Sequence, residues 1–558
     1  MLALSVLAPS VHAQTCNGVF LSTQAEVNAF DCVDVGALRV SGDVASLAGL
    51  STLRTVAGEF SIRGVAAITD LSGLEQLESV GGRFFVGENA ALRSLDGLEA
   101  LRATGYIELR SNPVLERIDA LGGTAGTSFL RIENNASLES LDGLEALALS
   151  SIDVAGNERL ADLSSLSGMQ PAVGSVRIRN NPSLVTLEGL SGLREVTSAV
   201  YIADNDNLKD LRALAGIQRA GELSLVGNTS ARHFPEFQNG TDVQVVHLSG
   251  MRGMTSVDWL APVGRIESLV IEDNGLSVLL SSERRLTVRS IQISDAPRLR
   301  SLSGLDIEEG GKLAVSFAPS LVDIGDVRMP ARVESISLFN NVNLVNLEAF
   351  RTVESLGGLW LQGNESLQTV DDFQFVREVE VFDGNPYTGG VRIVQNSELQ
   401  NLTGLGGVAS LRGEPLIVTG NRRLADCSCG LYRLLNGAGA PGYFEISENA
   451  DGCASMSQIR KPKSGSCSFP SAVGSTPSAF AVRIAPNPAL EVATVTWGQG
   501  DAERLEVLDA RGRRLVTLAV SENEYATTID VSGWAPGVYV VRLVADGAAR
   551  TGTFTVTR

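Results

Sequence analysis

A short pattern of apolar and polar positions recurs along most of the chain. Seven segments align without gaps, and each holds an apolar residue, any residue, an apolar residue, two variable residues and then asparagine. Most of them continue with a leucine three positions later. This alternation predicts a short β-strand with two side chains turned inward and one outward. The asparagines of the seven segments are Asn89, Asn112, Asn135, Asn157, Asn181, Asn205 and Asn228.

The pattern has a period of about 23 residues and continues beyond the seventh segment. The successive spacings of the seven asparagines are 23, 23, 22, 24, 24 and 23 residues. In three later copies the equivalent position holds Met251, Ala296 or Ala318. A period of this length is too short for a pair of helices and suits one strand with a compact return. The other later copies keep the asparagine, as Asn274, Asn341, Asn364, Asn396 and Asn421.

Strands repeated at this period predict a mainly β solenoid in which successive coils stack into one parallel sheet. Each asparagine lies where a strand turns inward, and its amide offers both donors and an acceptor. A stack of these side chains can satisfy buried backbone groups, so we expect an asparagine ladder. Looser turns are expected near residues 245–325, where the ladder residue is replaced. The gap of 32 residues between Asn364 and Asn396 predicts a loop insertion near residues 381–390.

The repeat resembles the leucine-rich repeat, whose core is apolar-x-apolar-x-x-Asn. The text between strands, such as SLDGLEAL at 94–101 and 140–147 and TLEGLSGL at 186–193, is more similar to the receptor L-domain variant. The resemblance covers about residues 38–425. It implies a right-handed β-helix of the kind that binds ligands in cell-surface proteins.

The first residues are typical of an export signal. Leu2 to Ala8 is apolar, and Val11-His12-Ala13 provides a small-x-small site. We expect a signal peptide over residues 1–13, with an apolar terminus as the alternative. The basic region that normally precedes the apolar run is missing, which leaves open a start upstream of Met1. No other stretch reaches the ~18 continuous apolar residues of a membrane span.

Six cysteines lie near the two ends of the repeat region. Cys16 and Cys32 precede the first coil and are expected to pair in a cap over residues 14–37. The others lie in a second cap over residues 426–467, at Cys427, Cys429, Cys453 and Cys467. Export favours disulfides, although four cysteines allow three pairings and a zinc site is the alternative. The second set resembles the cysteine cap of extracellular leucine-rich repeats, which implies the pairs Cys427–Cys453 and Cys429–Cys467.

A different pattern begins after a linker rich in serine and proline at 468–479. Residues 480–558 contain alternating strands separated by turns, which predict a small β-sandwich. This stretch resembles the type A C-terminal sorting domain of the type IX secretion system, with a carbohydrate-binding sandwich as the alternative. The resemblance implies the type IX machinery as a partner, and a secreted or outer-surface location in a Gram-negative bacterium. The residues that carry it are Pro486, Asn487, Pro488, Asp509, Gly512, Gly537 and Tyr539.

Charge and chemistry exclude several functions. Lys and Arg number 45 against 64 Asp and Glu, a net charge of −19, which disfavours nucleic acid and anionic membranes as partners. The three histidines form no metal-binding or catalytic motif, and no cofactor, metal or catalytic residue is expected. Outward carboxylates such as Glu108 and Asp153 alternate with Arg131 on adjacent coils, so cross-strand ion pairs explain them.

Outward strand positions supply the candidate binding residues. Coil stacking should align Phe85, Glu108, Arg131, Asp153, Arg177, Tyr201, Ser224, His247, Val270, Gln292, Ala314, Ser337, Trp360 and Arg392 in one column. Arg110, Arg131, Arg177, Arg179 and Tyr201 predict a basic, partly aromatic patch, and Phe339 and Trp360 an aromatic pair one coil apart. Arg and exposed aromatic residues are typical interface anchors. The sequence thus favours a recognition or adhesion protein for a protein or glycan ligand. A structural spacer without a ligand is the first alternative, and a polysaccharide-acting β-helix enzyme the second.

Overall fold

The chain folds into two compact units, one ending at Phe469 and one beginning at Pro470. The computed structural model describes most of the first unit and the strands of the second. Its described ranges are 15–281, 283–380, 389–411, 414–436, 441–461, 483–485, 489, 491–496, 504–509, 513–520, 526–545 and 548–557.

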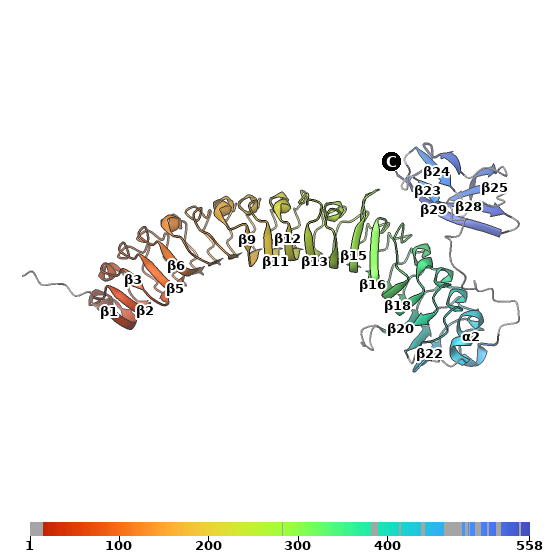
Figure 1. Ribbon diagram of the computed structural model, residues 1–558, viewed down its shortest axis with the longest axis horizontal. Coiled ribbons are helices and arrows are strands. Elements are labelled where there is room, and N and C mark those ends of the chain that lie inside the picture. The colour runs from red at the N-terminus through yellow and green to blue at the C-terminus, as the bar shows by residue number, and fades with distance from the viewer. Residues whose placement is uncertain are drawn as a thin grey trace, which may run out of the picture. The chain divides into compact units, whose positions relative to one another are not determined.

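The first unit is a parallel β-solenoid of about 17 coils of ~23 residues, as the repeat predicts. Its strands line the inner side of a gentle arc, and short 3-10 turns lie on the outer side (Figure 1). They are β1 (Thr15–Thr23), β2 (Asp34–Asp43), β3 (Thr55–Val56), β4 (Phe60–Arg63), β5 (Ser79–Gly87), β6 (Ala103–Arg110), β7 (Phe129–Glu133), β8 (Ser151–Ala155), β9 (Ala172–Val173), β10 (Ser175–Arg179), β11 (Glu195–Ala203), β12 (Arg219–Val226), β13 (Asp242–Ser249), β14 (Ile266–Glu272), β15 (Leu286–Ser294), β16 (Leu305–Ser316), β17 (Arg332–Phe339), β18 (Ser355–Gln362), β19 (Glu378–Val379), β20 (Gly390–Val394), β21 (Leu416–Thr419) and β22 (Phe444–Ser447).

Helical structure in this unit is short. Among the described residues, no helix is long and apolar enough to span a membrane. The helical elements are α1 (Gln24–Asn28), α2 (Ser428–Asn436), η1 (Ala48–Leu50), η2 (Asp119–Gly123), η3 (Ser164–Gly168), η4 (Glu188–Leu190), η5 (Arg212–Gly216), η6 (Asp258–Leu260), η7 (Glu348–Thr352), η8 (Asp371–Phe373), η9 (Thr403–Leu405) and η10 (Met456–Gln458).

The core follows directly from the repeat. The two inward residues of each strand, such as Ile107 and Leu109 in β6, are fully buried. The leucines of the return, such as Leu98 and Leu101, are buried on the other side of the coil. Because each coil packs on its neighbours in the same register, one continuous aliphatic core extends through the unit.

The asparagine ladder forms in two runs. In a typical rung, the main-chain N–H and the Nδ2 of Asn112 both donate to the Oδ1 of Asn135, each at 3.1 Å. The same Nδ2 donates to the Val86 carbonyl of the preceding strand at 3.0 Å. The residue before the ladder position, Ser111 in this coil, adopts a left-handed φ of 56° that turns the chain inward. Equivalent bonds join the rungs from Asn89 to Asn228 and from Asn341 to Asn421.

Asn274 is the exception to the predicted ladder. Its Oδ1 accepts from Leu276 N at 2.9 Å, within its own turn. Its Nδ2 is buried and has no hydrogen-bond partner among the described residues. The neighbouring coils carry Met251 and Ala296, which have no amide to continue the chain of bonds. The ladder resumes where Ala318 N donates to Asn341 Oδ1 at 3.1 Å.

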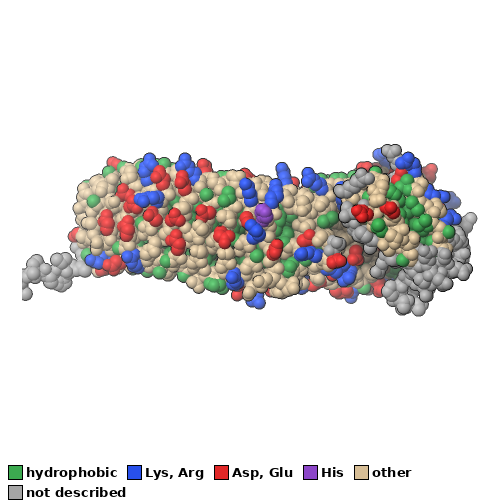
Figure 2. All heavy atoms as spheres, turned by 90° about the horizontal axis from the view of Figure 1, so that it is seen from above, with side chains coloured by type: hydrophobic (Ala, Val, Ile, Leu, Met, Phe, Trp, Pro, Cys, Tyr) green, Lys and Arg blue, Asp and Glu red, His purple; other side chains and the backbone are tan. Residues whose placement is uncertain are grey.

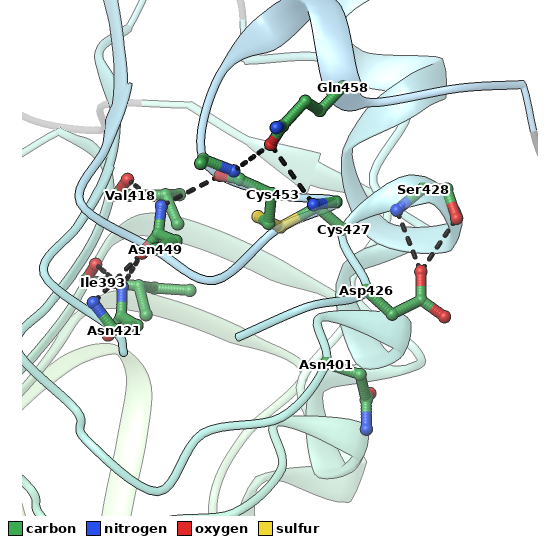
Figure 3. Close-up of a disulfide and its surroundings, with 12 residues drawn as sticks. Ile393, Asn401, Val418, Asn421, Asp426, Cys427, Ser428, Asn449, Cys453 and Gln458 are labelled. Carbon is green, nitrogen blue, oxygen red and sulfur yellow. Dashed lines mark hydrogen bonds between the residues drawn. A yellow bond between two sulfur atoms is a disulfide. The ribbon is translucent and has the colours of Figure 1, made fainter. Parts of the chain in front are cut away.

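The sheet extends into both predicted caps, and the ladder extends into the C-terminal one. Strand β1 already pairs in parallel with β2, so the sheet begins at Thr15 rather than near residue 38. At the other end, β22 pairs with β21, beyond the predicted limit of residue 425. Asn449 then adds a rung that the sequence analysis missed, because 28 residues and helix α2 separate it from Asn421 (Figure 3).

Each end of the solenoid contains a disulfide, as expected. Cys16 pairs with Cys32, and Cys427 pairs with Cys453 (Figure 3). Cys429 is also disulfide-bonded. Cys467, the partner that the resemblance implies for it, lies outside the described residues. One disulfide therefore lies at the first described coil of the solenoid, and the other lies at the last.

The second unit contains two antiparallel sheets that share one apolar core. One sheet has the order β23-β24-β27 and the other β26-β25-β28-β29. Residues from both sheets, such as Val495 and Val541, are buried in the same cluster. The strands are β23 (Arg483–Ala485), β24 (Val492–Thr496), β25 (Arg504–Asp509), β26 (Arg514–Ala519), β27 (Ala526–Asp530), β28 (Gly537–Ala545) and β29 (Ala548–Val556).

Candidate binding surface

The outward strand residues form the expected column. Arg131 in β7 lies between Glu108 in β6 and Asp153 in β8, and each residue is in register with the next. The same register places Trp360 in β18 beside Arg392 in β20. The middle of the strand face is therefore a continuous row of side chains, one from each coil.

A hollow of about 600 Å³ opens near the N-terminal end of this face. Glu108 lies at its centre, with a side chain only 6% exposed. Its carboxylate lies 2.6 Å from Arg83 Nη2 and 3.3 Å from Arg110 Nη1. The hollow is lined by Arg83, Tyr106, Glu108, Arg110, Phe129 and Arg131.

The predicted basic patch is wrong as a description of the charge here. Arg110 Nε lies 2.9 Å from Glu133, and Arg131 Nε lies 3.2 Å from Asp153. Arg179 also approaches Asp153, at 3.8 Å. The adjacent coils supply acids in register with these arginines, so their charges cancel locally. Acidic and basic side chains are also interspersed on the opposite face of the solenoid, which carries the returns and is seen in Figure 2.

Arg177 and Tyr201 form no ion pair in this network, although Arg177 is in register with Asp153. They are neighbours in register on β10 and β11. Arg177 is exposed and forms no ion pair with any residue that the structure describes. Tyr201 is half-buried. Of the predicted patch, this pair keeps an exposed arginine beside an aromatic ring.

The predicted aromatic pair is present near the C-terminal end of the same face. The rings of Phe339 and Trp360 are 4.6 Å apart and meet edge to face. Both side chains are half-buried. The guanidinium of Arg392 lies over the Trp360 ring, 5.2 Å from its centroid. Burial lowers the pKa of Arg392 from its ordinary value. The predicted insertion beside this group falls mostly at 381–388, outside the described residues.

Phe317 is a further aromatic residue that the sequence analysis missed. It follows β16 directly, in the coil next to Phe339, and is 50% exposed. It occupies the left-handed turn position where neighbouring coils have Asp295, Asn340 or Gly363. The sequence could have revealed Phe317, because it is a bulky apolar residue at a repeat position that small or polar residues hold in the neighbouring coils.

A second hollow, of about 470 Å³, lies at the returns of the coils near η6. Its floor contains Trp259, which stacks on Phe234 with ring centroids 5.6 Å apart. Trp259 is almost fully buried, so these rings pack mainly against each other. The hollow is best explained as a packing feature of a coil that has phenylalanine and proline in place of the usual leucines.

His247 Nε2 on the strand face lies 3.6 Å from Glu272. No cluster of three or more metal-binding side chains occurs in the part of the chain that the structure describes.

Part of the predicted sorting motif lies in the described residues of the second unit. Asp509 closes a hairpin by accepting from Arg513 N at 2.9 Å. Tyr539, two residues after Gly537, donates to the Ala535 carbonyl at 2.6 Å. Residues 483–557 match the family model of the secretion system C-terminal sorting domain. This unit is a type IX sorting domain. Pro486, Asn487, Pro488 and Gly512 lie outside the described residues.

The sorting domain determines where the protein goes. Its presence indicates export to the cell surface or secretion. It matches only the C-terminal part of the chain, and a comparison with curated proteins finds no match for the protein. The role of the solenoid therefore has to be argued from its own surface.

The sorting domain also contains a buried carboxylate that the sequence analysis missed. Glu506 in β25 is fully buried. Its Oε1 lies 3.0 Å from Arg504 and 3.3 Å from Arg514, and Arg542 lies 3.9 Å from Oε2. The three arginines come from adjacent strands, so the cluster joins β25, β26 and β28 on one face of the sheet.

Proposed function

We propose that the protein is an exported recognition or adhesion protein that binds a protein or glycan ligand through the strand face of its solenoid. Export rests on the sorting domain. Binding rests on the side chains that the strand face presents, and no catalytic step is needed. Glu108 and Asp153, the most buried carboxylates of this face, are held by arginines and are poor candidates for general acids or bases.

The Phe339–Trp360 pair is the observation that carries this proposal. Both residues point outward from a sheet whose aliphatic core is already complete. A spacer would gain more from small or charged residues at these positions, because half-buried rings promote non-specific association. Aromatic rings with a cation beside them are typical anchors of binding sites.

One observation favours the spacer as the second candidate. The charges around Glu108 satisfy each other within the solenoid, as they would on a surface that needs no ligand. On this alternative, the Phe339–Trp360 pair would be a chance exposure of rings on a structural rod.

The test is a screen of the purified full-length chain on glycan and protein arrays. Trp360→Ala and Arg177→Glu remove the two candidate anchors, and Gln292→Ala is a matched control at an exposed outward position between them. Binding that either anchor variant loses and the control keeps supports the proposal. Binding that is unchanged in both variants rejects this face, and no binding on any array favours the spacer.

A further inference from the structure

Phe317 occupies a backbone position that disfavours it. Its φ of 53° lies in the left-handed region, where bulky side chains are rare outliers. The side chain gains little in return, because half of it is exposed. An asparagine, as at Asn340 in the next coil, would fit this turn without strain. The turn requires this φ in the neighbouring coils too, so the strain comes from the choice of phenylalanine, and strained residues of this kind cluster at functional sites.

Phe317 begins a diagonal row across four successive coils. Its main-chain N–H donates to the Phe339 carbonyl at 3.0 Å, which joins the two coils at this point. Phe339 contacts Trp360, and Trp360 lies beside Arg392 in the next strand. Each coil from β16 to β20 thus contributes one ring or one guanidinium. We call this row of Phe317, Phe339, Trp360 and Arg392 the aromatic track.

The cation at the end of the aromatic track is only weakly compensated. Arg392 Nη1 donates to the Gly389 carbonyl at 2.5 Å. Glu414 is a carboxylate that acts on the pKa of Arg392, but burial has the larger effect, and the two form no ion pair. Several other cations of the strand face lie much closer to a carboxylate, as in Lys312–Glu334 at 2.5 Å. A half-buried charge with so little compensation is costly, and an anionic ligand would relieve that cost.

The groups around the rings are neutral hydrogen-bonding side chains. Ser316 precedes Phe317, Ser337 is in register with Trp360, and Gln362 is in register with Phe339. Hydroxyl and amide groups of this kind can donate to and accept from sugar hydroxyls. Strands β17 and β18 are internal to the sheet, so an extended peptide cannot add to an open edge here.

We propose that the aromatic track binds an acidic polysaccharide. The rings would stack on the apolar faces of successive sugars, and Arg392 would pair with a carboxylate or sulfate group. A pyranose unit is comparable in length to the strand spacing of about 4.8 Å, so neighbouring sugars can lie over neighbouring coils. This inference rests on the proposed function and names its ligand class.

The test measures affinity of the full-length chain for four soluble polymers. They are polygalacturonate as the carboxylated glycan, carrageenan as the sulfated one, dextran as the neutral one, and poly-glutamate as the acidic peptide. The expected result is preference for at least one acidic glycan over both dextran and poly-glutamate. Arg392→Gln should weaken that binding at least ~10-fold, as removal of an anchor does. The acidic glycan whose affinity falls most in Arg392→Gln shows whether Arg392 pairs with a carboxylate or with a sulfate group.

Phe317→Asn provides the sharpest variant, because it separates binding from folding. Relief of the turn strain should raise the melting temperature, whereas loss of the first ring should weaken glycan binding at least ~10-fold. A purely structural Phe317 would leave affinity unchanged, and that result would overturn the inference. Equal binding to poly-glutamate would replace the glycan with an acidic peptide. If no acidic glycan binds, but another ligand on the arrays binds and requires Trp360, the inference is rejected and the proposed function is retained.

Discussion

The main-chain N–H and the side-chain Nδ2 of Asn421 both donate to the Oδ1 of Asn449, each at 3.0 Å. Asn449 in turn donates to the Cys453 carbonyl at 3.2 Å, next to the disulfide with Cys427 (Figure 3). The ladder therefore ends on a cross-linked turn rather than on open backbone. Within each run, a rung has its acceptor in the following coil, so its contribution depends on that neighbour.

The two kinds of ladder asparagine should respond differently to truncation. Asn135→Ala removes the acceptor for two bonds from Asn112, so it should lower the free energy of unfolding by about 1–3 kcal/mol. Asn274→Ala should cost much less, because Asn274 bonds only within its own turn and its Nδ2 has no described partner. Denaturant unfolding of the two variants measures the difference. Equal losses would contradict this account of the ladder.

The interrupted part of the ladder should open more readily. No asparagine of the next coil accepts from the main-chain N–H of Met251 or Ala296 in the described residues, so these turns lack the ladder bond, and segments with fewer such bonds open more readily. We expect faster amide exchange over residues 245–325 than over residues 89–228, measured by hydrogen–deuterium exchange with mass spectrometry. Uniform protection of the two regions would show that the aliphatic core alone determines local stability.

The network at Glu108 should stabilise the N-terminal coils. Glu108→Gln leaves Arg83, Arg110 and Arg131 close together without their shared carboxylate, and the expected loss is about 1–3 kcal/mol. Glu139→Gln is the matched control. Its side chain is 70% exposed and, within the described ranges, pairs only with exposed Arg159, so its effect should be near zero. Thermal unfolding at low and high salt measures both variants, and an equal effect of the two would reject the network.

Removal of the sorting domain should prevent export across the outer membrane. A chain lacking residues 480–558 is expected to keep its folded solenoid, because that unit has a core of its own, and to accumulate in the periplasm. Cell fractionation with immunoblotting measures its location. Another protein with a sorting domain, expressed in the same cells, controls for general secretion. Normal surface display of the truncated chain would contradict the assignment.

The amino-acid sequence by itself determined the solenoid, its period and most ladder positions. Alternation within a strand is a local property, and recurrence about every 23 residues forces the strands into register. The outward column could be predicted for the same reason. The Cys16–Cys32 pair was expected from its place before the first coil, and the Cys427–Cys453 pair was implied by the resemblance to the cysteine cap of extracellular leucine-rich repeats. The sorting domain was recognisable because short elements occur in a fixed order at its turns.

The tertiary structure decided which of these positions cooperate. Asn274 has the right identity, yet it makes no ladder bond, because its Oδ1 accepts from Leu276 N within its own turn. The arginines at 110, 131 and 179 looked basic along the chain, and acids brought beside them by register cancel their charge. Asn449 and Phe317 matter through contacts with adjacent coils. Interactions between groups a full coil apart depend on register and side-chain direction, which the sequence pattern does not specify.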